Sequence, residues 1–130
     1  MVVVLLGVIA AFGMPNYTRA REKADEREAV ANLRMVVHAL ELYKNRNGGY
    51  PGFDMPQAGD INTTLNLGII EQNMDYNCVV AGADNTCTAV SPYGWQVQYS
   101  TATKANGVYC SVAGCPSCPA LNCSYAGLYE

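Results

Sequence analysis

The pattern of apolar and polar residues predicts one long helix in the first third of the chain. Residues 1–14 carry no charged or strongly polar side chain. Residues 16–47 contain neither Gly nor Pro and are rich in Ala, Glu, Arg and Leu, which favour helix. Two glycines and Pro51 then stop this run, as is typical of a helix C-terminus. We therefore expect a helix that ends near residue 47.

Two apolar rows run along the second half of this helix. The first recurs at one-, three- and four-residue steps and comprises Ala29, Val30, Leu33, Val36, Val37, Leu40 and Tyr43. The second lies on another side and comprises Ala31, Met35, Ala39 and Leu42. A helix on a single sheet needs only one such row, so we expect two burial partners. The contacts to the head are expected from Val30, Leu33, Val37, Leu40 and Tyr43.

The later part of the chain has the period of two that is typical of strands. Residues 93–99 alternate aromatic or Val with small or polar side chains, and residues 108–112 alternate again. The turn signal Asn106-Gly107 lies between the two runs. Residues 93–112 are therefore predicted to form an antiparallel hairpin. Flanking strands are expected at 75–80 and 124–129.

These elements predict one α+β domain, in which a long helix packs on a small antiparallel sheet. A chain of 130 residues can form one sizeable core but not two. We expect an N-terminal helical part at residues 1–28 and a globular head at residues 29–130. The head would consist of a helix, a loop with little core, and a sheet with a disulfide-rich end, at residues 29–47, 48–74 and 75–130.

The charge balance argues against nucleic acid as a partner. The formal net charge is -3 and the pI is near 5.0, so no basic excess exists to hold a phosphate backbone. Four basic and four acidic residues form a neutral run at residues 19–28. This run is either a solvated helix face or a set of pairs with neighbouring helices, and some of its i,i+4 spacings oppose like charges.

The six cysteines all follow position 77, which favours disulfides and an oxidising compartment. Cys78 and Cys87 are the natural local pair. The other four permit three pairings, of which we favour Cys110 with Cys123 around Cys115 with Cys118. A C-x-x-C spacing also occurs in redox motifs and zinc sites, but this one lies in a loop bounded by prolines, which favours structural use.

Residues for catalysis or cofactor binding are not apparent. His38 is the single histidine, and it lies on the helix without a nucleophile pattern nearby. The sequence contains no nucleophile elbow, phosphate loop, dinucleotide fingerprint, zinc-protease motif or calcium loop. We therefore expect a protein that is not an enzyme and that holds no cofactor or metal.

Two segments resemble the family of type IV pilins and type II secretion pseudopilins. Residues 1–17, MVVVLLGVIAAFGMPNY, are similar to the family's N-terminal segment from its middle onward. Residues 29–51, AVANLRMVVHALELYKNRNGGYP, are similar to the ALxxYxxxxGxYP pattern that closes the long helix. The resemblance implies a long helix, a loop and a small antiparallel sheet. It covers the first 50 residues, whereas the C-terminal sheet is matched only in general character.

The resemblance also raises an expectation about the N-terminus. Members of the family begin, after leader cleavage, with an N-methylated phenylalanine in a segment like FTLIE. Met1 follows the position of that segment, so we expect that about six residues have been lost, which would extend the apolar stretch to bilayer length. The basic residues behind this stretch would favour a cytoplasmic position, whereas the cysteines favour the opposite side. The sequence leaves this conflict open.

The function implied by the resemblance is structural. The subunit would wait in the inner membrane of a bacterium and then polymerise, with the pilus assembly machinery, into a helical filament of identical subunits at the cell surface. The filament core would be formed by Val2, Val3, Val4, Leu5, Leu6, Val8, Ile9, Phe12 and Met14. A helix break is expected at Gly7, Gly13 and Pro15. The alternatives are a major pseudopilin and a membrane-anchored binding module that does not polymerise.

Overall fold

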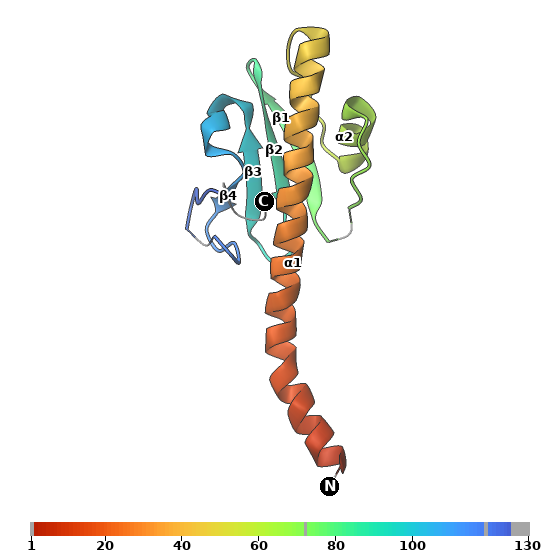
Figure 1. Cartoon of the computed structure of the whole chain (residues 1–130), viewed down its shortest axis with the longest axis vertical. Coiled ribbons are helices and arrows are strands. Elements are labelled where there is room, and N and C mark those ends of the chain that lie inside the picture. The colour runs from red at the N-terminus through yellow and green to blue at the C-terminus, as the bar shows by residue number, and fades with distance from the viewer. Residues whose placement is uncertain (1, 72, 119, 126–130) are drawn as a thin grey trace.

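The chain folds into a long helix that crosses one face of a small sheet and continues beyond it (Figure 1). The computed structural model describes the backbone of residues 2–71, 73–118 and 120–125, with side chains from residue 18 onward apart from 104–106. The long helix is α1 (Val2–Asn47), and a short helix, α2 (Ala58–Leu65), lies beside it. This arrangement confirms the predicted α+β class.

Helix α1 is continuous across the predicted break at Gly7, Gly13 and Pro15, so that prediction was wrong for this structure. A proline inside a helix removes one amide donor, but the turns on either side keep their own hydrogen bonds. The helix can then bend instead of stopping. Figure 1 shows such a curve in the N-terminal part of α1.

The C-terminus of α1 lies where the sequence predicted it. The helix ends at Asn47, and Gly48 takes a φ of 81°, the left-handed conformation that glycine adopts without a steric penalty. The amide of Gly48 donates a 2.8 Å hydrogen bond to the carbonyl of Lys44. This bond satisfies one of the carbonyls that a helix end leaves without an amide partner.

The sheet is an antiparallel meander in the order β1-β2-β3-β4. Its strands are β1 (Asp75–Ala81), β2 (Asp84–Val90), β3 (Gln96–Ser100) and β4 (Tyr109–Val112). Strand β1 confirms the flanking strand expected at 75–80, whereas β2 was not predicted. Alternate residues of β1, β2 and β3 are buried, and this buried side of the sheet packs against α1.

The predicted hairpin at residues 93–112 has the expected strand pairing but a different connection. Strands β3 and β4 pair antiparallel, and a 3-10 segment, Thr101–Asn106, joins them in place of a tight turn at Asn106-Gly107. Of the flanking strand expected at 124–129, Ser124 forms a single bridge with Tyr109. Residues 126–130 lie outside the described residues.

Residues 48–74, expected to be a loop with little core, contain α2 and several core residues. Ala58 and Ile61 of α2 are buried, as are Met55, Ile69 and Met74. Met55 bridges to Cys78 through hydrogen bonds of 2.8 Å in both directions, which attaches the segment to β1. The segment therefore packs against both α1 and β1.

Candidate assembly surface

The N-terminal part of α1 extends away from the head (Figure 1). At the base of the head, the guanidinium of Arg21 donates to the side-chain oxygen of Asn73 at 3.4 Å. The preceding residues, 2–20, add about 28 Å of helix at about 1.5 Å per residue. The predicted filament-core side chains all belong to this part and lie outside the described side chains: Val2, Val3, Val4, Leu5, Leu6, Val8, Ile9, Phe12 and Met14.

One face of α1 packs against the sheet. Val30 and Leu40 are fully buried and Leu33 is 1% exposed, while Val37 and Tyr43 are half-buried. Val36, from the same apolar row, is also buried. The buried residues of this face hold the head on the helix, and Tyr43 at its C-terminal end also lines an open groove.

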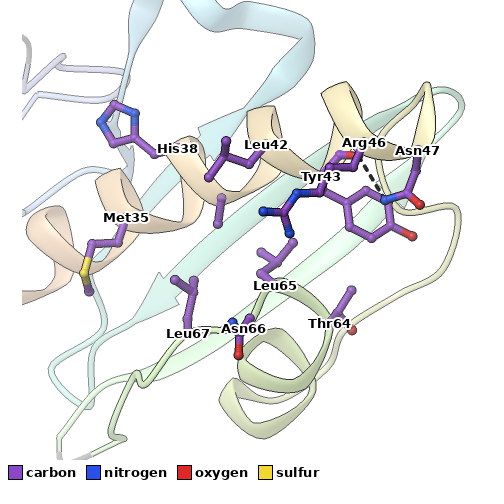
Figure 2. A pocket seen from close by; sticks show the side chains of 11 residues that line it. Met35, His38, Leu42, Tyr43, Arg46, Asn47, Thr64, Leu65, Asn66 and Leu67 are labelled. Carbon is purple, nitrogen blue, oxygen red and sulfur yellow. Dashed lines mark hydrogen bonds between the residues drawn. The ribbon is translucent and has the colours of Figure 1, made fainter.

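The second apolar row lies on a different face and is only partly covered. Ala39 is buried, but Met35 is 45% exposed and Leu42 is 56% exposed. Both line an open groove of about 480 Å³ between α1 and the C-terminal end of α2. Figure 2 shows Met35 and Leu42 above Leu65 and Leu67, with the groove between the two helices.

The groove is lined by apolar and polar side chains in similar numbers. The polar ones are His38, Tyr43, Arg46, Asn47, Thr64 and Asn66. Leu65 and Leu67 are half-buried and pack against the core cluster. Among the described residues that line the groove, none is acidic, and one residue, Arg46, has a permanent positive charge. His38 lies beside it on α1, without a cysteine or serine nucleophile among the lining residues.

Two acidic residues of the charged run are buried, which a solvated helix face would not require. Glu26 is 0% exposed. Its Oε2 accepts hydrogen bonds from the hydroxyl of Tyr125 at 2.6 Å and from the backbone amide of Ser117 at 3.0 Å. Charge-assisted hydrogen bonds of this kind allow a carboxylate to be buried. The sequence alone gives no signal that separates Glu26 from its exposed neighbours.

Asp25, the neighbouring buried carboxylate, faces the end of the loop before β1. It is 5% exposed, and its Oδ1 accepts a 3.4 Å hydrogen bond from the side chain of Asn73. The same side chain accepts from Arg21. The charged run is thus partly built into the base of the head, while Arg19, Lys23 and Glu28 stay exposed.

Hydrogen bonding and burial also hold the side chain of Tyr76 on β1 against α1. The amide of Asn32 donates a 2.8 Å hydrogen bond to the Tyr76 hydroxyl. Burial raises the pKa of Tyr76 to about 12, and the carboxylates of Glu28, Asp25 and Glu71 act in the same direction. The phenol is therefore neutral in the folded head near neutral pH.

All six cysteines are in disulfides, but the pairing at the C-terminal end differs from the one favoured from sequence. Cys78 pairs with Cys87, as expected. Cys110 pairs with Cys115, and Cys118 with Cys123. The backbone amide of Cys110 nevertheless donates to the carbonyl of Cys123 at 2.8 Å, so the favoured partners are neighbours that bond elsewhere.

The described part of the chain offers no evident site for a metal ion, since no group of three His, Cys, Asp or Glu side chains in it could hold one. Among the same residues, no helix combines the length and the apolarity needed to cross a bilayer.

Comparisons with curated proteins give two kinds of relative. The chain is 43% identical to the type II secretion system core protein G of Vibrio cholerae over 54 residues, which is 42% of this chain and 37% of that protein. It is 39% identical to the core protein G of Escherichia coli over 51 residues, 39% of this chain and 35% of that protein. These matches therefore span just over a third of the relatives' length.

The longer match is to the type IV wide pilus major component PilA4 of Thermus thermophilus. It has 29% identity over 109 residues, which is 84% of this chain and 79% of that protein. No protein-family model matches the chain, and no solved structure matches it.

Proposed function

We propose that this chain, which belongs to the family of type IV pilins and type II secretion pseudopilins, is a structural subunit that polymerises through α1 into a type IV pilus-like filament. The observation that carries the proposal is the relation to a pilus major component over 84% of the chain, which includes most of the head. The similarity to core protein G covers about 40% of the chain.

The form of α1 supports polymerisation. Residues 1–14 have no charged side chain, and the helix that contains them extends beyond the head (Figure 1). An apolar helix of this kind is not stable in water and must be covered by lipid or by protein. The subunit would be anchored in the bacterial inner membrane before assembly. It would then exchange lipid for the helices of its neighbours, so that the same surface stays buried.

The disulfides of the head favour a location outside the cytoplasm. These three disulfides need an oxidising compartment to form and persist. They close short loops, where they stabilise a head with few strands. Such a head suits the surface of a fibre. Adhesion, motility and DNA uptake are the functions we expect of the polymer, with the pilus assembly machinery as partner.

A major pseudopilin of a type II secretion system is the second candidate. The observation in its favour is the higher identity, 43%, over the shorter match to core protein G. The two candidates differ in where the polymer is found. A pilus extends from the cell surface at natural expression levels. The two candidates also differ in the effect of deletion, because loss of a pseudopilin would stop the export of enzymes into the medium.

The decisive experiment is to shear filaments from cells that express the chain at its natural level. Electron microscopy and mass spectrometry should find this chain as the main component. A deletion strain should lack the filaments and secrete normally. Normal filaments without this chain, together with a secretion defect, would favour the pseudopilin. Neither a filament nor a secretion defect would favour an anchored module that does not polymerise.

A further inference from the structure

The groove between α1 and α2 gathers polar side chains whose hydrogen-bonding groups the head itself does not use. Its polar lining residues are His38, Tyr43, Arg46, Asn47, Thr64 and Asn66. Of these side chains, only that of Asn47 has a hydrogen-bond partner within the described part of the chain, the carbonyl of Tyr43 at 3.1 Å. The others leave their donors and acceptors available to a ligand.

Arg46 is the cation of this groove. It belongs to the last turn of α1, where a positive charge offsets the helix dipole, but that role leaves its N–H donors available. The other cation of this turn, Lys44, is placed differently, with its Nζ 5.0 Å from the ring centroid of Tyr50. Figure 2 shows the guanidinium of Arg46 directed into the groove between Leu42 and Leu65.

The charge of the groove differs from that of the chain as a whole. The formal net charge of the chain is -3, whereas the described lining residues include Arg46 and no acidic residue. A concave surface of one sign attracts ligands of the opposite sign. The planar guanidinium pairs with carboxylates through two parallel hydrogen bonds. The groove therefore favours a ligand that carries a carboxylate.

The rest of the lining indicates that this ligand is polar beyond its carboxylate. The hydroxyls of Tyr43 and Thr64 and the side-chain amide of Asn66 lie along the groove beside the apolar surface of Leu65. A fatty acid would cover these polar groups without pairing them, which costs free energy for each group that loses water. A sugar acid pairs them, because it combines a carboxylate with several hydroxyls and an apolar C–H face.

We propose that this groove binds an acidic sugar residue, a uronic acid, of a polysaccharide outside the cell. Arg46 holds the carboxylate. Tyr43, Thr64 and Asn66 exchange hydrogen bonds with the sugar hydroxyls, and Leu65 contacts the C–H face of the ring. The groove volume of about 480 Å³ lies within the range of small-molecule sites. Because the groove is open, a polymer can enter and leave it on either side of the bound residue.

The position of the groove on α1 is compatible with a ligand outside the cell. Arg46 lies about 48 Å beyond Met14 along the helix, at about 1.5 Å per residue. A subunit anchored through residues 1–14 would thus present the groove well outside the bilayer. The biological role, adhesion to an acidic polysaccharide, rests on the proposed function, whereas the binding step requires only the folded chain.

Sugar binding is measured on the full chain in lipid nanodiscs and on purified filaments, by titration with trigalacturonate and saturation-transfer NMR. Trigalacturonate should bind saturably. Its methyl ester has the same hydroxyls without the charge and should bind about tenfold more weakly, because the charge-assisted hydrogen bonds are lost. A capped triglutamate peptide has the same number of carboxylates without the hydroxyls. It should also bind about tenfold more weakly.

Two variants locate the site. Arg46→Gln should lower the affinity for trigalacturonate by about tenfold or more, since it removes the partner of the carboxylate. Lys44→Gln is the matched control, because it removes a cation from the same turn of α1 but not from the groove lining. It should change the affinity by less than about twofold. Both residues are exposed, so both variants should fold, which near-UV circular dichroism checks.

Filaments and nanodisc-bound chains that do not bind trigalacturonate would overturn the inference while the polymer itself stands. Equal binding of the methyl ester, equal or tighter binding of the peptide, or equal losses in the two variants would also overturn it. Binding in nanodiscs by a chain that forms no filament would refute the proposed function and leave the sugar site in place.

Discussion

The hydroxyl of Tyr125 donates a 2.6 Å hydrogen bond to the carboxylate of Glu26, across a separation of 99 residues. The bond joins the C-terminal disulfide region to α1 close to the point where the helix leaves the head. Glu26 is fully buried, and the backbone amide of Ser117 donates to the same oxygen. The position of the head on the helix thus depends on a polar contact as well as on the apolar face.

Tyr125→Phe should therefore destabilise the head. The substitution keeps the ring but removes one donor from a buried carboxylate, which costs about 1–3 kcal/mol. Urea unfolding of a soluble fragment that begins at Thr18, followed by circular dichroism, measures the change. Tyr93→Phe is the matched control, because Tyr93 is 42% exposed, and it should change stability by less than about 0.5 kcal/mol. Equal effects of the two substitutions would show that the hydroxyl of Tyr125 is not held by Glu26.

Disulfide mapping without reductant should recover three links, Cys78–Cys87, Cys110–Cys115 and Cys118–Cys123. Partial acid hydrolysis between Cys115 and Cys118 is needed to separate the last two. Each short loop is expected to contribute roughly 2 kcal/mol by limiting the unfolded chain. Recovery of a Cys110–Cys123 peptide would contradict the structure and restore the pairing favoured from sequence.

The stability of the head should fall as the pH rises from about 10 toward 12. Burial raises the pKa of Tyr76 to about 12 in the folded head, whereas the ordinary value is 10.0. In this interval the folded state binds more protons than the unfolded state, so the free energy of unfolding decreases with pH. The loss from this residue is of the order of 2 kcal/mol. Unfolding of wild type and Tyr76→Phe should show a smaller alkaline loss in the variant, and identical pH slopes would contradict the assignment.

The sequence predicts those parts of the fold that local signals determine. Glycine after the last apolar residue of a helix is a local stop, and Gly48 does end α1 in the left-handed conformation. Helix α2 and strand β2 give no such signal, because Asp, Asn and Thr are frequent in both segments. They form because Ile61 in α2 and Cys87 in β2 bury against distant elements. Such tertiary contacts override weak propensity.

The candidate assembly surface was predictable in part for the same reason. The two apolar rows of α1 follow from helical spacing, and Met35 and Leu42 of the second row are exposed in the structure. The second burial partner expected for that row stays a prediction. The groove was not predictable, because its other wall belongs to the unpredicted α2. The burial of Glu26 depends on Tyr125, far along the chain. The spacing of charges on one helix carries no information about such a partner.

The final prediction concerns the N-terminal stretch. Leu5→Asp or Val4→Asp should abolish filaments, because the new carboxylate would enter a core of packed helices where no partner exists for it. An unpaired buried charge costs several kcal/mol, and helical symmetry repeats that cost in every subunit. Leu121→Asp is the matched control, since Leu121 is 61% exposed on a loop of the head, and it should leave filament yield close to wild type.

Filament yield after shearing measures the effect of these three variants, and near-UV circular dichroism of the full chains in detergent checks the heads. The near-UV signal should be the same in all of them, because it reports the packing of aromatic side chains such as Trp95, which is 3% exposed and distant in sequence from the changed positions. A lost signal in Leu5→Asp would mean that the head had been damaged. Normal filaments from Leu5→Asp and Val4→Asp would place this stretch outside the core, and the anchored module that does not polymerise would then explain the chain better.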